Sequence, residues 1–231
     1  MRIESYADRA LSELYPPFPG VRANFVTSLD GAVEVGGVSA GLSGEADKRV
    51  FRLLRMVCDA LMVGAGTFRA ENYKPLTLDP QRRAWRDERG LSRYPRMVVV
   101  SKSLDLDPGH PALAGAIVLT TGVAGVDVAL ARVAEIVPCD DLAHGLELLR
   151  GRGFRHVLCE GGPGLLGELT RLDLVDEVCL TVSPLLAGPG SGRIIAGAPH
   201  PARGMRIEHV LTADDGTVLM RHVRSGPRQA T

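Results

Sequence analysis

The sequence has no excess of charge of either sign. Its 231 residues include 27 Lys and Arg against 27 Asp and Glu, so the formal net charge at pH 7 is zero. No global attraction therefore favours nucleic acid or an anionic membrane surface, and any phosphate binding must come from a local arrangement of donors. We expect no nucleic-acid partner.

Long apolar runs are also missing. None approaches the ~20 residues that a membrane-spanning helix needs, and the first residues do not combine a basic start with the apolar segment of a secretory leader. The sequence therefore predicts a cytoplasmic protein that does not contact a membrane. With 45% hydrophobic residues, it has enough apolar side chains for the core of one domain.

Cysteines are few and scattered. Cys58, Cys139, Cys159 and Cys179 form no C-x-x-C pair and have no histidine at metal-ligand spacing. The H-x-E and P-C-x-x-C signature of zinc deaminases is absent, and none of the six histidines pairs by spacing with a serine or cysteine nucleophile. These absences argue against a metal site and a hydrolytic triad, and they favour a reducing compartment.

Short apolar segments alternate with amphipathic ones along most of the chain. Uninterrupted apolar runs followed by polar or glycine turns are typical of strands buried on both faces of a mostly parallel sheet. Segments of helical spacing lie between them, and this alternation predicts a three-layer α/β/α domain. The expected strands are 21–28, 60–63, 97–100, 116–119, 157–158, 177–183 and 218–223, and the expected helices are 43–57, 126–133 and 142–150.

The remaining segments are expected to lie outside these layers. Three prolines within residues 16–19 forbid regular structure, so residues 1–20 are predicted to form a surface arm that precedes the core. Residues 71–96, in which arginines alternate with acids, are predicted to be a solvated loop. A single domain over residues 21–225 and a short tail, 226–231, complete the expected organisation.

Two glycine-containing turns follow predicted strands. Gly64-Ala65-Gly66-Thr67 comes directly after one, and Glu160-Gly161-Gly162-Pro163-Gly164-Leu165 follows another. Three glycines within four residues cost backbone entropy that a simple turn does not need, which indicates that a ligand approaches the main chain. A helix starting there would aim its N–H groups at a phosphate. The spacing differs from the G-x-G-x-x-G of a Rossmann site, and a tight structural turn is the alternative for the first motif.

Three further strand ends carry polar side chains. Ser101-Lys102-Ser103 offers two hydroxyls and an ammonium group suited to the 2′-phosphate of NADP, with an exposed lysine in a turn as the alternative. Thr120 and Thr121 are placed to touch adenine or ribose. Asn24, Thr27, Ser28 and Asp30 lie around the end of the first strand and are the candidate substrate-site residues. The Asp30 carboxylate can orient or protonate a substrate, and the alternative is that Asp30 only forms the turn before Gly31.

These motifs resemble a known family, the reductase domain of the riboflavin-biosynthesis deaminase/reductase proteins. The resemblance rests on four strings in the family's order and approximate spacing, from about residue 21 to 223: Thr27-Ser28-Leu29-Asp30-Gly31, Asp59–Thr67, Glu160-Gly161-Gly162-Pro163 and Leu174-Val175-Asp176-Glu177. It implies a dihydrofolate-reductase-like fold, NADPH as hydride donor and a homodimer. The implied reaction is reduction of the ribosyl group of 5-amino-6-(5-phosphoribosylamino)uracil to ribityl. We expect a stand-alone reductase without the family's deaminase half.

The resemblance also implies roles for particular residues. Matched positions place Thr27 and Asp30 near the substrate and Glu160 between the substrate and the cofactor. Our own candidates are Asp30 for orienting or protonating the substrate and Glu160 for hydrogen-bonding it, and we expect Arg55 to make a structural pair near its helix. By analogy with dihydrofolate reductases, we expect a cis peptide between Gly161 and Gly162. The cofactor would be lined by Gly64, Ala65, Gly66, Thr67, Gly161, Gly162 and Gly164, and Pro163, Leu165 and the hydroxyl-bearing strand ends complete the expected cofactor site.

One segment departs from the family. Ala40-Gly41-Leu42-Ser43 stands where members commonly have a Lys-Trp-Ile-Thr-like string, so a basic and an aromatic side chain are lost. This change concerns the phosphoribosyl substrate rather than the cofactor, because the glycine motifs are intact. The alternative functions are a pterin or dihydrofolate reductase, which would share fold and cofactor, and a non-catalytic nucleotide-binding module.

Overall fold

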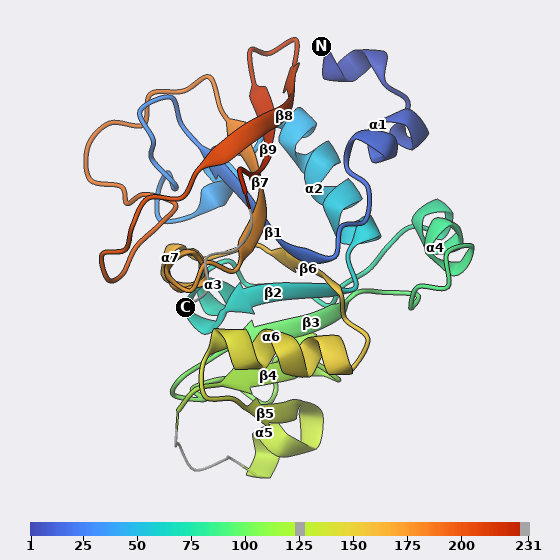
Figure 1. The fold of residues 1–231 in the computed structure, drawn as a ribbon, viewed down its shortest axis with the longest axis vertical. Helices are drawn as coiled ribbons and strands as arrows, with labels where there is room; N and C mark the ends of the chain where they lie inside the picture. The colour runs from blue at the N-terminus through green and yellow to red at the C-terminus, as the bar shows by residue number, and fades with distance from the viewer. Residues whose placement is uncertain (123–127, 227–231) are drawn as a thin grey trace.

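A nine-stranded sheet forms the centre of the molecule (Figure 1). The structure is a computed structural model, and it describes residues 1–122 and 128–226. The strand order is β5-β4-β3-β2-β6-β1-β7-β9-β8; all neighbours pair in parallel except at β9, which is antiparallel to β7 and β8. The strands are β1 (Gly20–Thr27), β2 (Ala60–Gly64), β3 (Arg96–Val100), β4 (Ile117–Thr120), β5 (Glu135–Pro138), β6 (His156–Cys159), β7 (Val175–Val182), β8 (Met205–Thr212) and β9 (Val218–Arg224).

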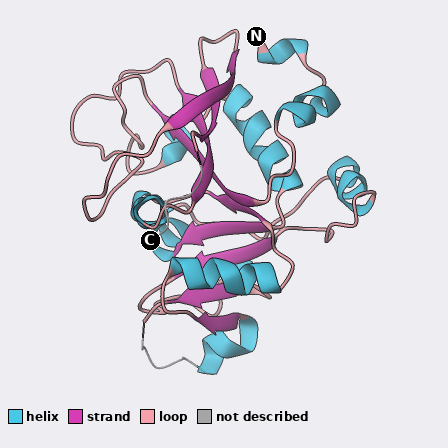
Figure 2. Ribbon diagram, in the orientation of Figure 1, coloured by secondary structure: helices cyan, strands magenta, loops and turns pink. Residues whose placement is uncertain are grey.

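Helices cover both faces of this sheet (Figure 2). The apolar sides of α6 and α7 pack on one face. On the other face, α1 and α2 form one apolar cluster, and α3 and α5 contribute to another. The predicted three-layer α/β/α fold with a mostly parallel sheet is confirmed. The helices are α1 (Asp8–Leu14), α2 (Glu45–Val57), α3 (Ala65–Ala70), α4 (Pro80–Asp87), α5 (Val128–Val133), α6 (Leu142–Gly151) and α7 (Pro163–Arg171).

The two edge strands, β5 and β8, were not predicted from the sequence. β5 buries a single residue, Val137, and the first four residues of β8 are at least partly exposed. An edge strand needs no continuous apolar run, because one of its sides meets solvent, so neither segment carries the signal used for the central strands. The helix expected over 126–133 corresponds to α5 (Val128–Val133), and residues 126 and 127 lie outside the described part of the chain. Of the expected tail, only Gly226 is described.

The expectation that the core begins after residue 20 is wrong. Ile3, Leu11 and Tyr15 are each at most 2% exposed and pack into the cluster under α2. The proline-rich stretch 16–19 does lack regular structure, as its composition predicts. Local composition cannot reveal that the short helix before it has a complementary apolar surface to pack against.

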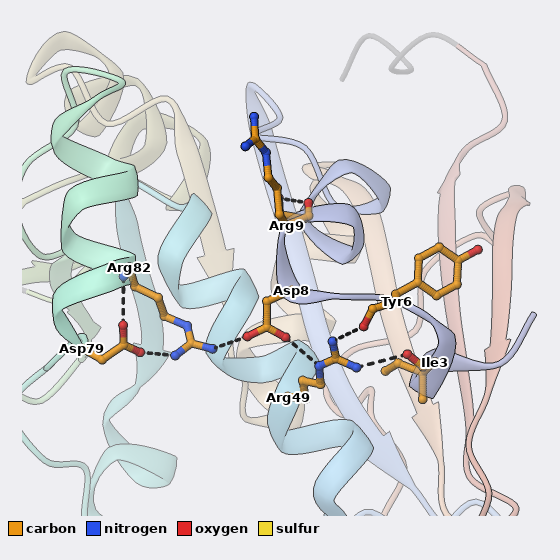
Figure 3. Close-up of polar contacts among 8 residues, drawn as sticks. Ile3, Tyr6, Asp8, Arg9, Arg49, Asp79 and Arg82 are labelled. Atoms are coloured by element: carbon orange, nitrogen blue, oxygen red, sulfur yellow. Dashed lines mark hydrogen bonds and ion pairs between the residues drawn. The ribbon is translucent and has the colours of Figure 1, made fainter.

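Polar contacts also attach this N-terminal segment to α2 and α4 (Figure 3). Arg49 of α2 donates to the carbonyls of Ile3, at 3.1 Å, and Tyr6, and it pairs with Asp8 at 2.8 Å. The other carboxylate oxygen of Asp8 lies 3.4 Å from Arg82 of α4. Residues 1–15 are therefore part of the domain layer that carries α2.

The prediction that residues 71–96 form a solvated loop is wrong for α4. Arg86 of this helix is fully buried and donates to the carbonyls of Met56 and Cys58, at 2.8 and 2.6 Å, and of Ser92 at 2.6 Å. The first two carbonyls belong to the C-terminal end of α2, where backbone acceptors have no partner within the helix. The alternating charges of this segment are typical of a solvated surface, yet one of its arginines, Arg86, is buried and caps the C-terminal end of α2.

Candidate active site

The predicted site motifs lie at one edge of the sheet. β1, β2, β3, β4 and β6 run parallel to one another, so their carboxyl ends meet there. The Gly64 turn follows β2, the Ser101 turn follows β3, Thr120 ends β4 and Glu160 follows β6. Elements separated by more than 100 residues are thereby brought to a single region.

The two glycine turns touch each other. The Gly64 N–H donates to the Gly161 carbonyl at 2.7 Å, and the Gly161–Gly162 peptide is cis, as expected. A Cβ on Gly162 would lie 2.2 Å from Thr67 Oγ1, and one on Gly161, where φ is +96°, would lie 3.0 Å from the Phe25 ring. The positive φ of Gly161 and the Phe25 ring therefore favour glycine at position 161 without any ligand, and the Thr67 hydroxyl leaves little room for a side chain at position 162.

Two other glycines leave open space. A Cβ built on Gly66 or Gly164 would meet no atom within 4 Å, and both residues lie in the first turn of a helix. The N-cap of α7 is Gly162, and no side chain there accepts a hydrogen bond from the first N–H groups of α7. Bare backbone facing free space beside a helix N-terminus fits the pyrophosphate of a dinucleotide.

The polar ends of β3 and β4 divide into buried and exposed groups. The hydroxyls of Ser101 and Thr120, each 3% exposed, accept backbone N–H groups of their own turns at 3.1 and 3.2 Å. Lys102 is exposed and Thr121 half-buried. A Cβ on Gly122 would lie 2.1 Å from the Lys102 carbonyl, so the two turns are in contact. Lys102 and Thr121 therefore reach the surface, whereas Ser101 and Thr120, which were predicted to contact the cofactor, are buried and bonded within their own turns.

Asp30 connects the loops that follow β1 and β7. Its carboxylate accepts hydrogen bonds from the Ser28 hydroxyl and from the N–H groups of Ala187, at 3.1 Å, and Gly188, at 2.8 Å. The bond from Ser28 and those from the two backbone groups lower the pKa of Asp30 to about 2. At neutral pH the carboxyl is ionised, which suits orientation of a substrate loop and not delivery of a proton.

Glu160 is held by two side chains. Its carboxylate, with the side chain 2% exposed, accepts from Arg55 Nε and Nη2 at 2.7 and 2.6 Å and from the Tyr73 hydroxyl at 2.8 Å. The predicted structural pairing of Arg55 is confirmed. Burial and the adjacent carboxylate raise the pKa of Tyr73 well above its usual value. Sequence analysis missed Tyr73, because it lies in the polar segment interpreted as solvated loop.

The carboxyl half of β1 is incompletely covered. Although β1 lies in the middle of the sheet, Asn24, Phe25 and Val26 are only half-buried, whereas Thr27 and Ser28 are buried. Phe25 faces α7 and the glycine turns, and by strand alternation Asn24 and Val26 face α2. This end of β1 is thus only partly covered on both faces, beside the glycine turns on one face and beside α2 on the other. A cavity of about 700 Å³ between α7, β7 and β9 contains none of the predicted site residues.

Comparison with known proteins decides the family. Residues 19–219 match the profile of the RibD C-terminal domain, which is most of the chain. The chain belongs to the RibD C-terminal domain family. The resemblance inferred from the four strings is confirmed.

Individual members of the RibD C-terminal domain family support this assignment. The chain is 30% identical to the 2,5-diamino-6-ribosylamino-4(3H)-pyrimidinone 5′-phosphate reductase of Methanothermobacter thermautotrophicus over 202 residues, 82% of this chain and 90% of that protein. It is 27% identical to the Archaeoglobus fulgidus enzyme of the same name over 86% of this chain and 95% of that protein. A pyrimidine reductase-like protein from Corynebacterium diphtheriae shares the fold, with a TM-score of 0.82, 24% identity and 97% of both chains covered.

Proposed function

We propose that this chain is an NADPH-dependent reductase of riboflavin biosynthesis that converts the ribosyl group of a phosphoribosylated aminopyrimidine into ribityl. The observation that carries the proposal is the open backbone cradle at Gly66 and Gly164 beside the uncovered end of β1. This arrangement occurs in a chain 30% identical to a reductase that acts on such a compound. The sequence resemblance suggests a uracil ring, and the names of the relatives suggest a diaminopyrimidinone.

The cofactor would lie across the carboxyl ends of β2, β6, β3 and β4. Ala65, Gly66, Thr67, Pro163, Gly164 and Leu165 would surround its pyrophosphate and nicotinamide ribose, and Lys102 and Thr121 its adenosine end. When bound, it supplies a hydride from the nicotinamide C4 position. The protein contributes alignment of that carbon with the substrate.

The substrate would lie on the α2 side of β1. Asn24 is half-exposed on that side of β1. Asp30 joins the two loops that would border the substrate. The ion pair of Arg55 and Glu160 would stabilise the α2 side of the substrate site. Since the Glu160 carboxylate is turned toward Arg55 and Tyr73, we propose that it positions Arg55 rather than binding the substrate directly.

We also propose a cytoplasmic homodimer. The four cysteines are free thiols, which suits a reducing compartment. None of the helices in the described ranges has the length and apolar character of a membrane span. Leu180, Met220 and Val210 lie side by side across β7, β9 and β8 and are only half-buried, and a second copy of the chain would cover them.

The first test is reduction of candidate substrates. Purified protein should oxidise NADPH with 5-amino-6-(5-phosphoribosylamino)uracil or its 2,5-diaminopyrimidinone counterpart at a kcat/KM of about 10⁴ M⁻¹s⁻¹ or more. Dihydrofolate should be poor, because each buried donor intended for the phosphate and left unpaired costs about 1 to 3 kcal/mol. A tenfold preference for dihydrofolate would show that the proposed substrate class is wrong.

Cofactor choice is tested at Lys102. Lys102→Ala should weaken NADPH binding by about 1.5 to 3 kcal/mol, the range for hydrogen bonds to charged groups, while NADH binding should change little. Only NADPH carries the 2′-phosphate that the ammonium group would contact. Titration of each cofactor against both proteins measures the effect, and equal affinity of the unmodified protein for NADPH and NADH would contradict the assignment.

A further inference from the structure

The cavity between α7, β7 and β9 has no role in the proposed function. Its volume of about 700 Å³ lies in the range of small-molecule sites, about 300 to 1,000 Å³. None of the described residues that line it belongs to the glycine turns, to β1 or to the patch of Leu180, Met220 and Val210 that a second copy would cover. This cavity, called the α7 cavity below, is therefore separate from the proposed cofactor, substrate and subunit contacts.

Arginines dominate the charge of the α7 cavity. Arg193, Arg203 and Arg224 line it, and Asp173 is the only acid among its described lining residues. The Asp173 side chain is 2% exposed; it accepts from Arg224 at 2.6 Å and lies 3.3 Å from Arg203. Arg224 also donates to two backbone carbonyls at 2.9 and 2.5 Å, and Asp176, outside the lining, lies 3.7 Å from it. Three guanidinium groups and two carboxylates leave the described wall positively charged.

Apolar side chains form much of the remaining lining. Leu166 of α7, Val178 of β7, Ile195 and Met205 all contribute to it. Val178 and Met205 are only half-buried, and Ile195 is 39% exposed. A ligand that covers such side chains removes apolar surface from water, which favours binding. Cations beside apolar surface match a molecule that carries an anionic group on an apolar ring.

The segment 193–203, which contributes both cations and apolar groups, is attached to α7. The Ala196 N–H donates to the Pro163 carbonyl at 3.1 Å. A Cβ on Gly167 would lie 1.9 Å from the Ala196 carbonyl oxygen, so the absence of a side chain at Gly167 allows this close approach. Arg193 and Ile195 therefore extend from a backbone whose position is fixed before any ligand arrives, and such preorganisation reduces the entropic cost of binding.

We propose that the α7 cavity binds an organic monophosphate with an aromatic ring, at a second site distinct from those of the cofactor and the substrate. Planar guanidinium groups bind phosphate oxygens through two parallel hydrogen bonds. Arg193 is exposed and has no hydrogen bond or ion pair with the described residues, so its guanidinium group can make these bonds. Leu166, Val178 and Ile195 would cover the ring. The inference goes beyond the proposed reduction and does not depend on it.

Flavin mononucleotide is the probe, and two fragments of it are the comparisons. Riboflavin lacks the phosphate, and inorganic phosphate lacks the ring. Fluorescence and calorimetric titrations should show saturable binding of flavin mononucleotide at least tenfold tighter than that of either fragment, unchanged by excess oxidised NADP, which cannot reduce the flavin. Absence of saturable binding, or equal affinity for riboflavin, would overturn the proposal. Displacement by oxidised NADP would place the probe in the cofactor cradle and would overturn it as well.

Arg193→Ala locates the phosphate. This variant should bind flavin mononucleotide at least tenfold more weakly, and the affinity for riboflavin should change little. Arg206→Ala is the matched control, because the Arg206 side chain is 62% exposed and does not line the α7 cavity. It should bind the probe as the unmodified protein does. Equal losses in the two variants would show a general effect of surface charge, and the assigned site would be wrong.

Ile195→Glu tests the cavity itself. It places a carboxylate beside the proposed phosphate, so binding of flavin mononucleotide should fall below detection. Val128→Glu is its control, since Val128 is 66% exposed on α5 and lies outside the lining. Thermal unfolding checks that all four variants are folded. Unchanged binding in a folded Ile195→Glu variant would mean that the probe binds elsewhere.

Discussion

Gly164→Ala should weaken NADPH binding at least a hundredfold while the protein becomes no less stable. A Cβ at this position meets no protein atom within 4 Å, so the fold has no reason to change. Alanine also restricts the unfolded backbone more than glycine does, which favours the folded state by about 0.4 to 1 kcal/mol where the native conformation suits alanine. The only object that the new methyl group meets is then the bound pyrophosphate, which would be pushed off the N–H groups of α7.

Gly162→Ala, by contrast, should abolish NADPH binding by a different route. Its Cβ would lie 2.2 Å from Thr67 Oγ1, so the Thr67 side chain must turn away toward the proposed cofactor site, although the sheet and helices should stay folded. Gly161→Ala should have the same outcome, because its Cβ would press on Phe25 and its φ of +96° is unfavourable for alanine.

Calorimetric titration of NADPH, with thermal unfolding of each variant, measures both effects. Gly151→Ala is the matched control, since it lies at the end of α6 and its Cβ also meets nothing within 4 Å. That variant should bind NADPH normally. Unchanged affinity in Gly164→Ala would mean that the pyrophosphate lies elsewhere.

Arg55→Met should lower the free energy of unfolding by about 3 kcal/mol or more, as removal of one partner from a buried ion pair does. The Glu160 side chain is 2% exposed, so its carboxylate would remain buried with Tyr73 as its only partner in the described structure. Glu160→Gln should cost less, because Arg55 is 24% exposed and reaches water, and because an amide oxygen still accepts from Tyr73.

The pair between Arg171 and Glu168 on α7 provides the comparison. It joins the same residue types at 2.7 Å, but the side chains are 41% and 37% exposed. Arg171→Met should therefore lower the free energy of unfolding much less than Arg55→Met does. Denaturant unfolding of the four proteins gives the values. An Arg55→Met variant no less stable than Arg171→Met would contradict a structural role for the buried pair, whereas loss of activity in the stable Glu160→Gln variant would support direct contact with substrate.

The elements that could be predicted from the sequence are those marked by a hydrophobic pattern within the element itself. The central strands and the helices α2 and α6 follow from apolar runs and helical spacing, which depend only on residues within one element. The polar and glycine turns that follow the predicted strands were correctly chosen as candidate site segments, because ligands of mostly parallel sheets bind beyond the carboxyl ends of the strands. Sequence motifs were also sufficient for the family, because their order along the chain is itself specific.

What the sequence alone determined, then, is the order of the elements, the family and the edge of the sheet that carries the site. The tertiary structure decided which side chains work together: Glu160 meets Tyr73 and Arg55 across 87 and 105 residues, and Asp47 meets Thr181 across the space between α2 and β7. It also decided that Ser101 and Thr120 are buried and that Arg86 caps α2. Burial, hydrogen-bond partners and shifted pKa values depend on atoms that come together only when the chain folds, so a local sequence pattern cannot predict them.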